Sequence, residues 1–118
     1  MRRKIAKAQG LEAIQAYLEG SVSDEQLATA VRFLLEELGT KYPGNSVEVR
    51  IPPYGAVQCI EGPSHSRGTP ANVVELDPES FVALALGQIS FEDLMSKSKL
   101  SASGNRSDLT GLFPIFKP

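Results

Sequence analysis

The chain has 118 residues, a formal net charge of −2 and 42% hydrophobic residues. This length predicts one domain spanning residues 1–118, with enough chain to bury an ordinary hydrophobic core. The single cysteine, Cys59, excludes an internal disulfide and a zinc site built on several thiolates. A lone thiol is typical of reducing compartments, so we expect a cytoplasmic protein.

Basic residues are concentrated at the N-terminus, where four of the first seven residues are Lys or Arg. The rest of the chain is therefore acidic and lacks the clustered cations that phosphate contacts require, which excludes a nucleic-acid partner. We predict that residues 1–7 form a flexible basic head. Transient contact of this head with an anionic membrane surface stays open.

Two helices are predicted in the first part of the chain. Residues 5–18 carry apolar side chains at helical spacing, and Gly20 is placed to end this helix in a left-handed conformation. Residues 23–26 form a capping box that begins the second helix, which we expect to end at Gly39. Because its polar face is acidic, this helix is expected to lie on a sheet rather than on a membrane.

The hydrophobic period then changes from that of a helix to that of a strand. Residues 47–51 alternate apolar and polar side chains, which predicts a strand with one buried face. Residues 56–61 are apolar on both faces, which predicts a second strand in the centre of the sheet. The short connection from residues 47–51 predicts that these two strands are antiparallel. Residues 73–76 predict a third strand, and alternation around residues 100–102 predicts a weaker fourth strand.

The C-terminal third predicts short helices. Residues 78–86 are apolar on nearly every side, so we expect a helix buried all round, capped by Asp77 and ended by Gly87. Ser90 begins another short helix, and Ser107 is predicted to cap a last helical turn. This order predicts an α+β fold, with a mostly antiparallel sheet of four to five strands whose one face is covered by helices.

The sequence offers little for catalysis. Cys59 and His65 are the only thiol and imidazole in the chain, and a Cys–His nucleophile is one hypothesis. We favour a buried structural cysteine, since free cysteine is among the most buried residue types. The chain shows no metal-ligand cluster, phosphate-binding glycine loop or nucleophile elbow, so we predict no metal, no cofactor and no enzyme activity.

Two features are candidates for ligand binding. His65 and Arg67 lie on a loop at residues 62–70 and are suited to a carboxylate or phosphate head group, although an ordinary solvated loop is the alternative. Large apolar residues crowd the last third of the chain, where they form either simple core or the wall of a pocket of ~300–1,000 Å³. The residues that would line such a pocket are Phe81, Leu84, Phe91, Leu94, Met95, Leu112, Phe113 and Phe116.

Several of these motifs occur together in a known order. Residues 72–94 (NVVELDPESFVALALGQISFEDL), residues 100–105 (LSASGN) and the turn at 109–113 resemble the sterol carrier protein type-two superfamily. A bacterial branch of sterol carrier family proteins is more similar, through residues 47–54 (VEVRIPPY) and 62–70 (GPSHSRGTP).

The resemblance implies a five-stranded sheet with helices, a hydrophobic tunnel for fatty acyl chains or sterols, and no catalysis by the domain. We therefore predict non-catalytic binding or transfer of an apolar ligand (a fatty acyl chain, a sterol-like lipid or an isoprenoid), with His65 and Arg67 at its polar head. The fifth strand of the family either lies within residues 62–70 or is missing from this chain. The alternative is an interaction or regulatory module with a filled pocket that acts through this loop, and a protein partner or a homodimer stays open.

Overall fold

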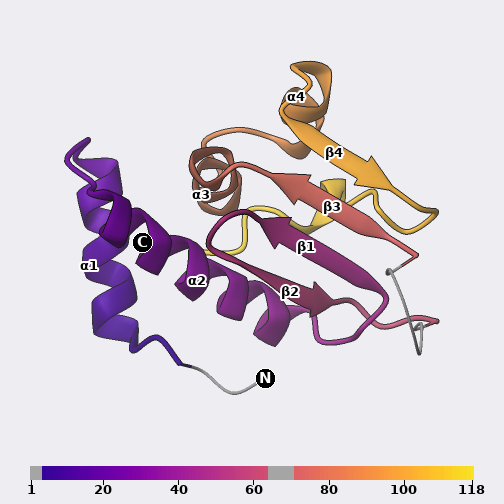
Figure 1. Ribbon diagram of the computed structural model, residues 1–118, viewed down its shortest axis with the longest axis horizontal. Helices are drawn as coiled ribbons and strands as arrows, with labels where there is room; N and C mark the ends of the chain where they lie inside the picture. The colour runs from indigo at the N-terminus through magenta and orange to yellow at the C-terminus, as the bar shows by residue number, and fades with distance from the viewer. Residues whose placement is uncertain (1–3, 64–70) are drawn as a thin grey trace.

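The computed structural model describes residues 4–63 and 71–118. Within these ranges the chain forms four α-helices and a four-stranded sheet, which confirms the α+β class (Figure 1). The elements in chain order are α1 (Lys7–Leu18), α2 (Asp24–Lys41), β1 (Val47–Ile51), β2 (Gly55–Cys59), β3 (Val73–Leu76), α3 (Pro78–Leu86), α4 (Phe91–Ser96), β4 (Leu100–Ser103) and the 3₁₀ helix η1 (Thr110–Leu112).

The sheet is mixed rather than mostly antiparallel, which corrects the prediction. Its strand order is β2-β1-β3-β4, and the two outer pairs are antiparallel while the central β1–β3 pair is parallel. The parallel pair arises because the chain leaves the β1–β2 hairpin and returns along the other edge of β1, with Glu48 opposite Val73. The described residues contain no fifth strand, and most of the segment expected to hold it, residues 64–70, lies outside them.

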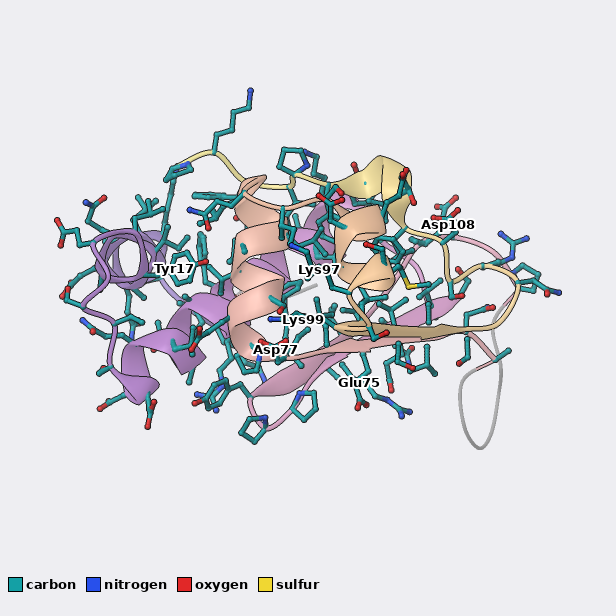
Figure 2. The ribbon with its side chains drawn as sticks, turned by 90° about the horizontal axis from the view of Figure 1, so that it is seen from above. Tyr17, Glu75, Asp77, Lys97, Lys99 and Asp108 are labelled. Atoms are coloured by element: carbon teal, nitrogen blue, oxygen red, sulfur yellow. The ribbon has the colours of Figure 1, made fainter. Side chains whose placement is uncertain are left out.

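β2 is an edge strand, so the prediction that it lies in the centre of the sheet is wrong. Its apolar composition was misleading because Ala56 is exposed, as is Gln58, and only Val57 and Cys59 are buried. β1 shows the clean alternation expected for a sheet covered on one face, with buried residues at every second position. Figure 2 shows α3 and α4 on the same side of the sheet.

Three predicted helix starts are confirmed by hydrogen bonds. Ser23 and Gln26 form the reciprocal capping box, with distances of 3.1 Å (Gln26 N to Ser23 Oγ) and 3.0 Å (Ser23 N to Gln26 Oε1). Asp77 Oδ2 accepts from the Ser80 amide at 3.0 Å, and Ser90 Oγ accepts from the Asp93 amide at 3.0 Å. Each bond satisfies an amide that has no partner within its own helix.

Two predicted helix boundaries and one burial pattern are wrong. α2 continues past the buried Gly39 to Lys41, because a glycine inside a packed helix keeps helical backbone angles when no left-handed turn follows. Ser107 does not cap a helix: its hydroxyl donates to the Gly104 carbonyl at 2.8 Å. α3 is not buried all round, since Glu79 in its first turn, just after the inner strand β3, is exposed.

A glycine and an aromatic ring fix the packing of α1 on α2. A Cβ atom at Gly10 would lie 2.4 Å from two carbons of the Phe33 ring, so only glycine permits this approach. On α2, the Phe33 ring also meets Phe116 edge-on, with ring centroids 5.4 Å apart. The C-terminal segment therefore ends beside α1 and α2, far along the chain from where they form (Figure 1).

A buried amide joins three loops at the opposite end of the sheet. The side chain of Asn72 donates to the Ser46 carbonyl at 2.8 Å and accepts from the Arg106 amide at 2.9 Å. A Cβ atom at Gly104, whose φ is +98°, would lie 2.3 Å from Asn72 Oδ1. The Gly-Asn turn after β4 is therefore shaped by its contact with the start of β3.

Candidate functional site

The first candidate site is a cavity of about 570 Å³ between α4, β4 and the residues leading into η1, which we call the C-terminal cavity. This volume lies within the ~300–1,000 Å³ typical of small-molecule sites. Its lining residues are Phe91, Glu92, Met95, Ser96, Ala102, Ser107, Asp108 and Thr110.

Two of the predicted pocket residues, Phe91 and Met95, line this cavity, and a third lies beside it. Met95 is 44% exposed, which is unusual for a large apolar side chain. A smaller hollow of about 260 Å³ shares Phe91 and Thr110 with the C-terminal cavity and is also lined by Phe113. Phe91 and Phe113 stack with centroids 6.5 Å apart and nearly parallel rings, so this ring pair forms an apolar wall.

The other predicted pocket residues lie elsewhere. Phe81, Leu84 and Leu94 are almost completely buried and belong to the hydrophobic core. Leu112 is half-buried in η1, and its carbonyl accepts from the Tyr42 hydroxyl at 3.3 Å.

Phe116 packs on Phe33, near the N-terminal helices. His65 and Arg67 lie outside the described residues. The structure thus gathers Phe91, Met95 and Phe113 in one place and separates them from Phe116.

The C-terminal cavity has an acidic rim. Glu92 and Asp108 line it, and none of the described residues that line it is Lys, Arg or His. Hydrogen bonds from the Thr110 hydroxyl and the Thr110 amide to Asp108 lower the pKa of its carboxyl group. Asp108, labelled in Figure 2, is therefore ionised at neutral pH, and the rim favours a ligand without negative charge.

A second cavity, of about 510 Å³, lies between α2, the edge strand β2 and the segment before α1; we call it the N-terminal cavity. Its lining residues are Lys4, Ile5, Arg32, Leu35, Glu36, Tyr54, Gly55, Ala56 and Val57. These residues come from three separate segments of the chain, so no sequence motif indicates this cavity. Leu35 of α2 is a buried core residue that also borders the cavity, and no periodic pattern in the sequence marks this.

Hydrogen bonds fix the walls of the N-terminal cavity. The Glu36 carboxylate accepts from the backbone amides of Lys4 and Ile5 at 3.1–3.2 Å, which holds the segment before α1 against α2. Arg32 Nε donates to the Tyr54 carbonyl at 3.0 Å, which ties α2 to the β1–β2 turn.

The thiol of Cys59 is placed in the core rather than in either cavity. Its residue is completely buried on the inner face of β2, and burial raises the pKa of the thiol to about 11. Little thiolate is therefore present at neutral pH. The described residues contain no group of three or more His, Cys, Asp or Glu side chains placed to hold a metal ion.

One comparison with known proteins identifies the family. Among curated proteins, none matches the chain. None of the helices in the described ranges has both the length and the apolar character needed to cross a membrane.

Residues 23–115 match the family model described as bacterial SCP ortholog, where SCP is sterol carrier protein, and this range covers most of the chain. Such proteins are generally non-catalytic carriers, and the family suggests lipid binding or transfer in general terms. The chain belongs to the bacterial SCP ortholog family.

Proposed function

We propose that this protein is a non-catalytic carrier that binds an apolar lipid reversibly in the C-terminal cavity. The observation that supports the proposal is the exposure of Met95 on an open cavity that Phe91 also lines, with the Phe91 ring stacked on Phe113 of the adjoining hollow. A flexible thioether suits a site that accepts ligands of differing shape. Burial of the ligand chain against these side chains supplies the affinity, at ~0.8 kcal/mol per CH₂ group.

In this proposal the ligand contacts Phe91, Met95 and Phe113, and its far end extends toward η1. The predicted residues Phe81, Leu84 and Leu94 act indirectly, because their burial in the core holds α3 and α4 in place. The ligand class is a fatty acyl chain, a sterol-like lipid or an isoprenoid. The acidic side chains of Glu92 and Asp108 favour forms with an uncharged head, such as an alcohol or an ester, over a free carboxylate.

A pair of matched variants tests the site. Met95→Arg places a large charged group on the wall of the cavity, whereas Leu18→Arg makes the same change on α1 at a residue of similar exposure, 41% against 44%. We expect Met95→Arg to weaken binding of long-chain alcohols by about tenfold or more, since it removes apolar contact and fills the cavity. Leu18→Arg should bind like the unmodified protein, and both variants should melt within a few degrees of it.

Calorimetric titration with dodecanol measures the two affinities. Equal affinities for Met95→Arg and the unmodified protein would show that the ligand does not occupy the C-terminal cavity. Native mass spectrometry of the purified protein, followed by solvent extraction, identifies any lipid carried from the cell. If no lipid is carried and none binds from a panel of alcohols, esters and sterols, the carrier proposal fails and a protein-interaction role is the remaining hypothesis.

A further inference from the structure

We propose that the N-terminal cavity is a second binding site, which takes a small amphipathic anion: an apolar chain that ends in a carboxylate. The proposal rests on residues of α2 and β2 that have no part in the proposed lipid site. It is therefore independent of the function of the C-terminal cavity.

The cavity has an apolar interior. Ile5, Leu35 and Val57 contribute its aliphatic wall, and Tyr54 contributes an aromatic ring. Leu35 and Val57 are buried core residues, so they present a fixed surface. A volume of about 510 Å³ is large enough for a small organic molecule rather than only for water.

Within the part of the chain that the structure describes, the rim of the N-terminal cavity carries two cationic side chains, Lys4 and Arg32. Among the described lining residues these two cations outnumber the one carboxylate, Glu36, which accepts from the Lys4 and Ile5 amides. This balance differs from that of the C-terminal cavity, whose charged lining residues are both acidic.

Arg32 is positioned before any ligand arrives. Its Nε atom donates to the Tyr54 carbonyl, which fixes the plane of the guanidinium at the mouth of the cavity. None of the hydrogen bonds seen within the described ranges uses its Nη atoms, so these two groups remain available to a carboxylate in a paired geometry. A ligand that places its carboxylate there can lay its chain along Leu35 and Val57.

The test compares two probes of equal chain length, sodium decanoate and decanol, at low ionic strength. Amide NMR spectra locate each probe, because Ala56 and Val57 report on the N-terminal cavity while Met95 and Thr110 report on the C-terminal cavity. We expect decanoate to shift the amides of residues 55–57 with an affinity about tenfold higher than that of decanol there.

Variants of Arg32 distinguish the contribution of its positive charge from that of its planar pair of donors. Arg32→Gln should remove the preference for decanoate, while Arg32→Lys should keep part of it because the charge remains but the planar pair of donors is lost. Lys41→Gln is the matched control, since it removes an exposed cation from the same helix at a distance from the cavity. Thermal melting of each variant confirms that α2 is still packed.

Three results would overturn the proposal. The first is equal affinity of decanoate for Arg32→Gln and for the unmodified protein. The second is decanoate-induced shifts that appear only at Met95 and Thr110. The third is a protein dimer formed through β2 that decanoate does not dissociate, which would assign the N-terminal cavity to a second copy of the chain. Failure of the dodecanol experiment on Met95→Arg would leave these outcomes unchanged.

Discussion

The two cavities differ in how their walls are built and in the charge at their rims. They lie along opposite edges of the sheet, one beside β2 and the other beside β4. The N-terminal cavity is walled by an 18-residue helix that crosses the core, and the C-terminal cavity by a six-residue helix that buries only two side chains. The two cavities therefore have similar volumes, but the helix that walls the N-terminal cavity is packed into the core much more extensively.

This difference suggests a division of roles. A wall that belongs to a long core helix cannot move without unfolding a large part of the protein, so the N-terminal cavity keeps one shape. α4 is attached through Phe91 and Leu94, and small displacements of it would widen or close the C-terminal cavity at little cost. A carrier that must load and release its ligand benefits from the second arrangement.

The largest effect is expected from truncating the residue that anchors α4. Leu94→Ala should lower the free energy of unfolding by about 2–5 kcal/mol, because Leu94 is 1% exposed and its removal leaves a cavity in the core. Binding of dodecanol should be lost as α4 loosens, whereas binding of decanoate should persist. Urea unfolding and calorimetric titration measure the two effects.

Leu35→Ala is the counterpart on the other wall, since Leu35 is also buried and lines the N-terminal cavity. It should cost a similar free energy but weaken decanoate binding and spare dodecanol binding. If both variants changed the binding of both probes equally, the two cavities would not be independent sites.

A smaller effect is expected where α1 packs on α2. Gly10→Ala should lower the free energy of unfolding by about 1–3 kcal/mol, because the new methyl group overlaps the Phe33 ring and the packed core resists its displacement. The clash outweighs the helix propensity that alanine would otherwise add. Gly111→Ala is the control, since no atom lies within 4 Å of a Cβ added there.

Thermal unfolding of these two glycine variants measures the difference. A Gly10→Ala protein as stable as the unmodified one would show that α1 can shift on α2 freely. The N-terminal side of the molecule would then be less rigid than the packing of α2 in the core suggests.

The smallest effect is expected at the start of α3. Asp77→Ala should cost about 1 kcal/mol by removing the helix cap, and Asp77→Asn should retain most of the stability because the amide also caps. Burial raises the pKa of Asp77, but hydrogen bonds from Ser80 and the charge of Lys99 outweigh it and lower the pKa below 3.8. Figure 2 shows Lys99, which precedes β4, beside Asp77.

The sign of the pH dependence follows from this lowered pKa. The stabilisation from ionised Asp77 is present above pH 3.8 and is lost as the pH falls through the lower pKa of the folded state. The advantage of the unmodified protein over Asp77→Asn should therefore shrink in acid, as followed by circular dichroism. An advantage that grows in acid would contradict this assignment.

Local chemistry was the most predictable part of the fold. Helix starts at Ser23, Asp77 and Ser90 depend on bonds within three residues, so the sequence alone locates them. The strand order was not predictable, since the parallel β1–β3 pair depends on how a connection of more than ten residues returns across the sheet. Apolar composition placed β2 in the centre, although its exposed face carries Ala56 and Gln58.

The candidate sites divide in the same way. Phe91 and Met95, both predicted from the apolar residues of the last third of the chain, line one cavity because they are neighbours on α4. Met95 is exposed whereas Phe81 and Leu84 are buried in the core, and no sequence pattern distinguishes a pocket wall from core. The N-terminal cavity requires residues near positions 5, 35 and 57 to converge, and only the tertiary structure shows this.

The burial of the single cysteine makes its thiol a probe for local opening of the sheet. Cys59 lies on the edge strand β2 with no exposed surface, so a thiol reagent reaches it only when β2 leaves the sheet. When reclosing is fast, the rate of labelling is proportional to the fraction of time that the strand is open. Labelling adds one mass increment per molecule, so mass spectrometry measures how often this edge of the sheet opens. Decanoate bound in the N-terminal cavity should slow the labelling of Cys59.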